Sequence, residues 1–424
     1  MADASTNAPL ALPPPPPLAR TPTPSRISIL HPGYRRGGNL LFCLPAVDYF
    51  DEPSSQTRTW GHHHATALIA GGIIANNAFD DVYFSHDRYG RTPITTPRDG
   101  ILEPGHYWLQ LNSIAGGMNH TPATRSSSPT PIDKYKYPIV PSFTDWPFPH
   151  GELPKEWQQP HEPPDQQNTD QETDRCFLTD VKIGLEKGHL VPSAQLEWFN
   201  RNEMGDYCEI STTNDINDPA NTMSLMANLY WAFDRPLFVI VPKPSTGSSS
   251  SGSPSRNKPQ SYAFVAHAIS TVPEARDFTN LYHNRSMQPK YFNILKREFL
   301  FARFAWALFL YLRKFIDRVD TAPLEVIIFE DDNYVSKSMT GKQFAKLRET
   351  RCESANRPRK QRRLSNRDGE PNGEDYAYED DTYQEGWRRR SASRESWHSH
   401  SERDGYDYED VNRGRPMYRG MSPS

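Results

Sequence analysis

The segment 176–243 constrains this chain more than any other, because it places a histidine, an asparagine and a short helix in a fixed order. His189 lies in a stretch that reads as part of a β-hairpin, and Asn221 lies in the loop that follows. Residues 225–234 then predict a short helix, which is followed by the apolar run 238–241. This order predicts a small module in which the hairpin presents His189 toward the asparagine and the helix.

The composition predicts folded segments separated by unfolded ones. The chain has 424 residues, which is enough for two modest domains. It contains 39 prolines and 24 glycines, and only 36% of its residues are apolar. The formal net charge of -4 gives no bulk attraction to nucleic acid or to anionic lipid. Any contact with nucleic acid therefore needs a local basic patch.

The cysteines and the apolar segments predict an intracellular protein without a membrane partner. The four cysteines are Cys43, Cys176, Cys208 and Cys352, and they form no CxxC pair, which favours reduced thiols in the nucleus or the cytoplasm. We expect no signal peptide at the proline-rich N-terminus. The apolar stretch 299–312 is shorter than the roughly 20 residues that a membrane span needs.

Shifts in composition divide the chain into segments of different character. We predict a disordered start at 1–25, a small α+β N-terminal domain at 26–115, a Pro-rich linker at 116–172, a motif-bearing domain at 173–335 with a flexible insertion at 244–260, and a disordered charged tail at 336–424. Within the linker, Trp146 and Phe148 are expected to anchor on a folded surface.

Two helices are expected to matter for packing. A helix over 62–77 in the N-terminal domain carries an apolar stripe on one face. A longer helix over about 290–318 is apolar on nearly all sides, which predicts burial on more than one side. The longer helix would support the motif segment or join the two domains.

The motif segment resembles the HNH endonuclease module, and more narrowly a large group of fungal proteins that carry it. The resemblance rests on Cys176-x-x-Thr179, Glu186-x-x-His189-x-x-Pro192, Asn221 and the helix that ends at Asp234. The phrase 298–307 and the N-terminal pattern around 39–77 extend it over roughly residues 26–340. The implied fold class is α+β: a ββα-metal (HNH) module packed on a long C-terminal helix, a separate small α+β N-terminal domain, and disordered termini.

The resemblance also implies roles in phosphodiester hydrolysis, which needs a base for water and a counter-charge for the phosphate. His189 matches the family's general base, and Asn221 matches the asparagine that orients the site. Two positions depart from the family. Tyr230 stands where the helix histidine binds a metal, and Gly188 stands where many relatives place a second ligand. A neutral phenol is a poor ligand, since its ordinary pKa is about 10.

A divalent metal such as Mg²⁺ would need other ligands. Asp234 lies one helical turn beyond Tyr230 and is a candidate oxygen ligand, although a carboxylate at a helix end more often bonds backbone. Asp215 and Asp218 in the preceding loop are further candidates. Two functions therefore stay open. One is a metal-dependent endonuclease that hydrolyses nucleic-acid phosphodiesters, and the other is a catalytically inactive HNH scaffold that binds nucleic acid or a protein partner. A purely structural domain is a third reading.

Two other features carry weaker signals. His62-His63-His64 resembles a metal-binding tract, but consecutive residues at a helix start point in different directions, which favours capping or packing. The basic run 358–363 is typical of a nuclear localisation signal or a nucleic-acid contact, and equally of an ordinary Arg-rich tail.

Overall fold

The computed structural model gives the fold of the central part of the chain. The residues it describes are 25–35, 38–51, 58–112, 135–158, 174–210, 215–244, 262–287, 291, 294–317 and 322–356. All of them belong to one compact unit, residues 1–357. The basic run 358–363 and nearly all of the predicted insertion at 244–260 lie outside the described residues. Within those described ranges, no helix has both the length and the hydropathy that crossing a bilayer requires.

A four-stranded sheet begins the mixed α+β fold. Its order is β2-β1-β7-β5, with β1 parallel to β7 and antiparallel to β2. The strands are β1 (Arg26–Leu30), β2 (Leu40–Pro45), β5 (Val82–Ser85) and β7 (Gly105–Leu111). Ile27 and Ile29 alternate with more exposed neighbours on β1 and are fully buried, as one face of a half-buried strand requires.

A second, three-stranded sheet leads directly into a buried helix. It consists of β3 (Asp48–Asp51), β4 (Arg58–His63) and β6 (Ile101–Leu102), in the order β3-β4-β6. Helix α1 (His64–Ile74) follows β4 without a break, so His62 and His63 belong to a strand rather than to the predicted helix. Every residue of α1 is buried, so the helix is covered on all sides instead of along one stripe.

Part of the predicted linker packs into the core. Residues 135–158 include η2 (Phe143–Asp145) and α3 (Lys155–Gln158). Trp146 and Phe148, the two expected anchors, are buried. The Trp146 ring stacks on Trp198, with centroids 5.8 Å apart and planes inclined by 1°. Aromatic burial of this size explains why a proline-rich stretch is held against the fold.

The motif segment forms a strand–strand–helix unit. It consists of β8 (Leu185–His189), β9 (Thr222–Met226) and α5 (Ala227–Asp234). Between the two strands lie η3 (Ser193–Gln195), α4 (Leu196–Arg201), η4 (Met204–Tyr207) and η5 (Pro219–Asn221). The helix was predicted to begin at residue 225, but residues 222–226 pair with β8 as an antiparallel strand and the helix begins at Ala227.

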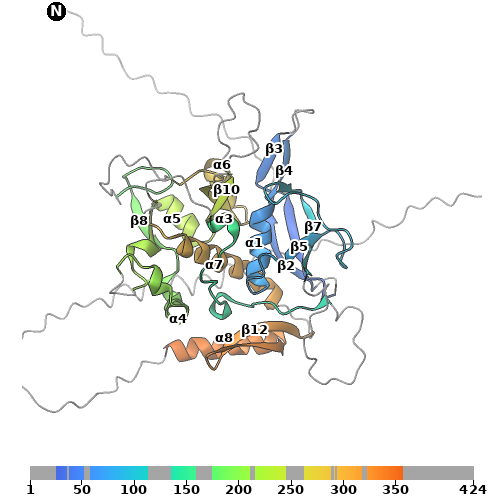
Figure 1. The fold of residues 1–424 in the computed structure, drawn as a ribbon. Helices are drawn as coiled ribbons and strands as arrows, with labels where there is room; N and C mark the ends of the chain where they lie inside the picture. The colour runs from blue at the N-terminus through green and yellow to red at the C-terminus, as the bar shows by residue number, and fades with distance from the viewer. Residues whose placement is uncertain are drawn as a thin grey trace, which may run out of the picture. The chain divides into compact units, whose positions relative to one another are not determined.

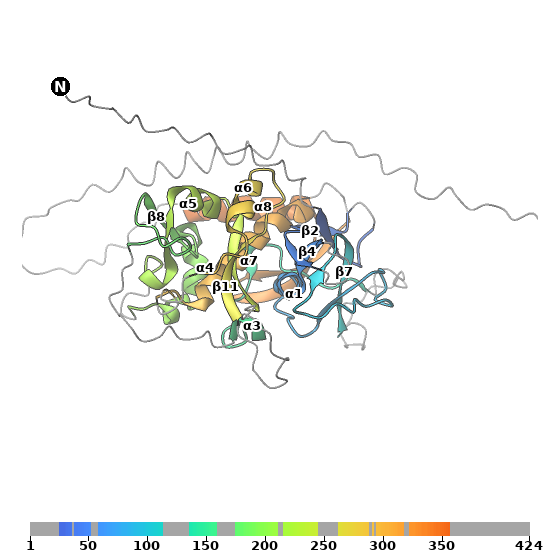
Figure 2. The ribbon, with the colours of Figure 1, turned by 90° about the horizontal axis from the view of Figure 1, so that it is seen from above.

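Helix α7 connects the N-terminal strands with the strands that follow the motif. The elements here are the hairpin β10 (Phe238–Pro244) and β11 (Tyr262–Ala268), then α6 (Ala275–Tyr282) and α7 (Arg297–Ile316). In both Figure 1 and Figure 2, α7 runs between β2 and the motif unit, and it contacts both β2 and β10. Arg303 of α7 is buried with its guanidinium 3.8 Å from the Phe233 ring centroid, and it donates to the Phe233 carbonyl at the end of α5.

Regular structure continues beyond the point where a disordered tail was predicted. The hairpin of β12 (Leu324–Glu330) and β13 (Asn333–Met339) is followed by α8 (Gly341–Asn356). Arg351 of α8 holds this end of the chain to the core: it donates to the buried carboxylate of Asp145 at 2.8 Å and to the Phe329 carbonyl at 2.7 Å. The domain boundaries inferred from composition otherwise stay predictions.

Replacing Gly61 tests the close approach of β4 and β6. A methyl group on Gly61 would lie 2.1 Å from the Leu102 carbonyl oxygen, a backbone atom that cannot move alone. We expect Gly61→Ala to lower the free energy of unfolding by about 1–3 kcal/mol, as overpacking does. Urea denaturation followed by tryptophan fluorescence measures the change. Gly105→Ala on β7 is the control, since its methyl would meet only ordinary contacts at 3.7 Å; equal loss in both variants would contradict the prediction.

Candidate active site

His189 lies at the end of β8, where the hairpin opens into the long loop. It is the last residue of the strand and pairs with Thr222, the first residue of β9. The preceding Gly188 is buried, whereas His189 is half-buried, so part of the imidazole reaches solvent. The structure therefore presents the predicted base at the edge of the strand–strand–helix unit.

Asn221 is completely buried and bonds only to backbone. Its Oδ1 accepts from the Val191 amide at 2.8 Å, and its Nδ2 donates to the carbonyls of Val191 at 3.1 Å and Ile216 at 2.7 Å. Its own carbonyl accepts from the Leu190 amide at 2.8 Å. Asn221 thus fixes the chain just after His189 to the loop. Among the described residues, its side chain forms no hydrogen bond with the imidazole of His189.

The partner of His189 is Asn217, which the sequence analysis did not single out. Nε2 of His189 lies 3.1 Å from Oδ1 of Asn217. The Asn217 side-chain and backbone nitrogens both donate, at 3.0 Å, to Oδ1 of Asp215. The only available signal was the pattern Asp215-x-Asn217, because aspartate commonly accepts from the backbone two residues on.

These bonds define the tautomer of His189. A carboxylate oxygen can only accept, so the side-chain atom of Asn217 that faces Asp215 is the NH₂ group. The oxygen of Asn217 therefore faces His189, and Nε2 of the imidazole must carry the hydrogen. In the neutral ring this leaves the lone pair on Nδ1, which is the nitrogen that can take a proton.

The two aspartates of the loop, Asp215 and Asp218, differ in their burial and in their hydrogen-bond partners. Asp218 is buried, and its carboxylate accepts from the backbone amides of Ala220 at 2.8 Å, Glu209 at 2.9 Å and Ile210 at 3.0 Å. This carboxylate caps η5 and is committed to backbone. Asp215 is exposed and orients Asn217.

Gly188 and Tyr230, the positions where the resemblance implies metal ligands, lie side by side. A Cβ atom on Gly188 would lie 3.2 Å from the Phe233 ring and 3.4 Å from the Tyr230 ring. Asp234 ends α5 and is half-buried. Among the described residues, the one grouping of three or more His, Cys, Asp or Glu ligand atoms lies elsewhere in the fold. The residues around His189 therefore do not fit a metal ion held by three protein ligands.

The grouping elsewhere in the fold consists of Asp48, His62 and His267, and it belongs to a buried polar network around Asp48. Oδ1 of Asp48 accepts from Lys243 at 2.5 Å, His283 at 2.9 Å and Asn284 at 3.0 Å, and Oδ2 accepts from the His63 amide at 2.8 Å. Burial alone would raise the pKa of Asp48, but Lys243 and His283 outweigh burial and hold it well below its usual range. Burial lowers the pKa of Lys243.

The histidine triplet at the β4–α1 junction packs in three directions. Nδ1 of His62 lies 2.9 Å from the Pro45 carbonyl, Nδ1 of His63 lies 2.9 Å from the Thr66 hydroxyl, and Nδ1 of His64 lies 2.9 Å from the Thr96 carbonyl. Burial lowers the pKa of His62 to about 4 and that of His63 to about 3. All three are buried, as a packing role requires.

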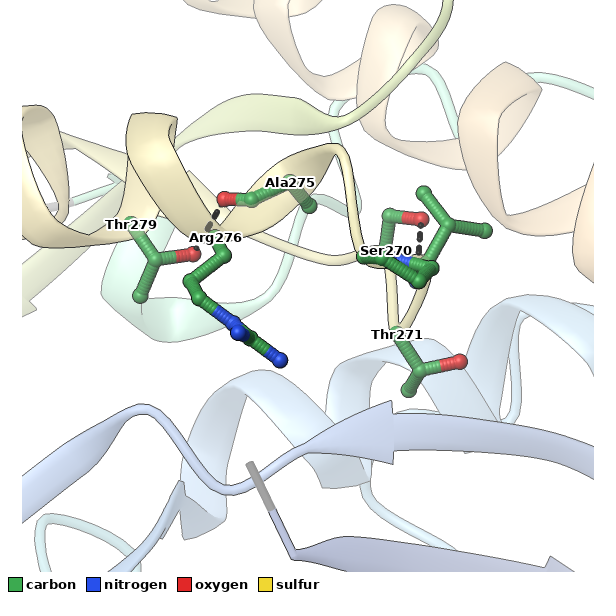
Figure 3. Close-up of a pocket in the computed structure, with 7 residues that line it drawn as sticks. Ser270, Thr271, Ala275, Arg276 and Thr279 are labelled. Carbon is green, nitrogen blue, oxygen red and sulfur yellow. Dashed lines mark hydrogen bonds between the residues drawn. The ribbon is translucent and has the colours of Figure 1, made fainter. Parts of the chain in front are cut away.

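Two hollows in the described structure lie away from His189. The hollow in Figure 3 is lined by residues of the loop 270–273 and the first turns of α6, and its volume of about 10 Å³ leaves room for one water at most. The other has a volume of about 460 Å³ and lies between η4 and the start of α7. Neither of these two hollows is lined by a residue of β8, β9 or α5.

The comparisons with known proteins bear on the same segment. Residues 167–241 match the family model of the HNH endonucleases. No match was found among curated proteins or among solved structures. The strand–strand–helix order of β8, β9 and α5 lies within the matched residues, as do His189 and Asn221. Residues 167–241 are thus similar to an HNH endonuclease domain, and this similarity supports an HNH-family protein.

Proposed function

We propose that this chain is an HNH nuclease-like protein that acts on the phosphodiester backbone of nucleic acid. The observation that carries the proposal is the state of His189. Its imidazole lies at a strand end in reach of solvent, and its Nε2 is bonded to Asn217, which leaves Nδ1 to accept a proton. A positioned histidine of this kind is the usual general base at neutral pH.

In this proposal His189 takes a proton from water while the water oxygen attacks phosphorus. The imidazolium that forms keeps its Nε2–H bond to Asn217, and the carboxylate of Asp215 lies one amide further on. Asn221 contributes by holding the backbone of Val191, so that the end of β8 does not move.

A metal would supply the counter-charge for the phosphate and the leaving oxygen in this family. Tyr230 and Asp234 are the positions on α5 that we propose could contact Mg²⁺ or a similar ion that keeps most of its waters. Because Gly188 and Tyr230 offer no strong ligand, we assign no step to such an ion.

The second candidate is a binding scaffold without hydrolysis. The absence of strong metal ligands at Gly188 and Tyr230 favours this binding scaffold directly. The surface of α5 also favours contact with nucleic acid: Trp231 is 43% exposed, and the Arg235 guanidinium lies 4.3 Å from its ring centroid. Cation–aromatic pairs of this kind stack on bases and attract phosphates.

We also keep three finer points as proposals. They are kinship with the fungal HNH group, the division into separate units at 26–115 and 173–335, and a nuclear or cytoplasmic location. None of them changes the chemistry expected at His189.

Removing the base separates the two candidate functions. We expect His189→Ala to slow plasmid nicking by about 10²–10⁴-fold, the usual contribution of general acid–base catalysis. His106→Ala, which removes an exposed histidine on β7, is the matched control and should nick like the parent. If the parent does not nick, or if both variants nick equally, the enzyme reading fails. Duplex binding that weakens steeply with salt in every variant would then favour the scaffold.

The role of Asn217 can be measured without activity. Asn217→Ala removes the acceptor at Nε2, so ¹⁵N NMR of His189 should show the ring passing from one tautomer to a mixture. Nicking should fall by roughly five-fold, which corresponds to about 1 kcal/mol for one hydrogen bond. Asn217→Gln retains an amide and should recover part of the loss. An unchanged tautomer in Asn217→Ala would contradict the assignment.

Restoring the family's ligand tests the metal position. Tyr230→His places an imidazole beside Gly188, and imidazole binds divalent transition metals far better than a neutral phenol. We expect metal affinity and nicking to rise together in this variant, as measured with Mn²⁺ and Zn²⁺ titrations. Tyr230→Phe is the control for loss of the hydroxyl alone. A gain in affinity with no gain in nicking would favour the scaffold.

A further inference from the structure

We infer a second site, specific for a zinc-class divalent cation, where β3, β4 and β11 meet. Asp48, His62 and His267 each offer a ligand atom, and these atoms lie within 4.8 Å of one another. The three residues are 3%, 0% and 0% exposed. Carboxylate and imidazole in a dry, enclosed setting are the donors that zinc prefers among protein groups without thiolate.

The bond to Pro45 sets the tautomer of His62. Its Nδ1 lies 2.9 Å from the Pro45 carbonyl oxygen, which can only accept, so Nδ1 carries the hydrogen. Nε2 of the neutral ring therefore carries a lone pair. Nε2 of His267 lies 3.2 Å from that lone pair, and the two rings meet edge to face with centroids 4.6 Å apart.

No neutral arrangement of His267 satisfies the network. If Nε2 donates to His62, then Nδ1 holds a buried lone pair 3.9 Å from a carboxylate oxygen of Asp48, and it has no hydrogen-bond partner. If the hydrogen is on Nδ1 instead, two Nε2 lone pairs face each other at 3.2 Å. A buried polar atom without a partner is costly, so such an atom needs an explanation.

A divalent cation removes the clash between the two Nε2 lone pairs. With the hydrogen of His267 on Nδ1, this group points toward Asp48, while the Nε2 atoms of His62 and His267 converge on the ion. Two nitrogens bound to one tetrahedral zinc are about 3.3 Å apart, given zinc–nitrogen bonds of about 2.0–2.1 Å. The observed 3.2 Å matches that spacing. The Pro45 carbonyl behind His62 is the usual outer support of a ligand histidine, and Asp48 offers the third ligand atom.

The positive charge of Lys243 lies beside the proposed ion site and would weaken binding of the ion. Its ammonium bonds Oδ1 of Asp48, together with His283 and Asn284, whereas His267 faces Oδ2. The cation would therefore meet a neighbouring positive charge, and removing that charge should strengthen binding. The three residues come from three strands, so the ion would have a structural role and hold β3 and β4 to β11.

The experiment uses the full chain, treated with chelator and then titrated with Zn²⁺ and Co²⁺. We expect one equivalent to bind, a Co²⁺ absorption spectrum typical of low coordination with nitrogen ligands, and a higher thermal midpoint in the loaded protein. A chelated protein that is folded by circular dichroism and binds neither ion would overturn the inference.

Variants locate the ion. His267→Gln should weaken binding by about 100-fold, the upper end of what loss of even an outer partner costs. Asp234→Asn should still bind one equivalent of the ion, which distinguishes this site from the metal position proposed on α5. Lys243→Met should bind the ion more tightly than the parent does. This variant leaves all three ligand residues in place. A folded His267→Gln variant that binds the ion as tightly as the parent would refute the site. If His267→Gln does not fold, the site is refuted when Lys243→Met binds the ion no more tightly than the parent.

Discussion

The apolar surface of α7 is the constraint on which the rest of the structure depends. Its side chains are buried along nearly the whole helix, and it contacts β2, β10, α1 and η2. A helix that is apolar on all sides has to be covered on all sides. Each covering element gains roughly 25 cal/mol for every Å² of apolar surface removed from water. Strands from both halves of the sequence are therefore held to one helix, and the motif unit is fixed to it through Arg303 and Phe233.

In the strand–strand–helix unit, backbone hydrogen bonds hold the chain beside His189, whereas the positions of the expected metal ligands are occupied by Gly188 and Tyr230. Asn221 commits its whole amide to backbone, so the chain just after His189 is held to the loop. The two departures from the family, Gly188 and Tyr230, form one packing arrangement, because the space beside Gly188 is taken by the rings of Tyr230 and Phe233. A larger residue at either position would need the other to change.

The sequence predicted the elements whose pattern is local. His189 on a strand, a helix ending at Asp234 and the long apolar helix all follow from residues near one another. It missed β9, since residues 222–226 become a strand only by pairing with β8 across a long loop. It also missed Asn217 as the partner of His189, because which side of the loop faces the imidazole depends on how η5 is capped by Asp218.

The sequence by itself determined the order of the motif and which residues, His189, Asn221, Gly188 and Tyr230, occupy its positions. Only the tertiary structure decided which polar groups share a buried environment. Asp48, His62 and His267 come from three strands, and no spacing in the chain relates His267 to the other two. The physical reason is that periodicity reports which face of one element is buried, whereas partners for buried polar groups come from whichever elements the core brings together.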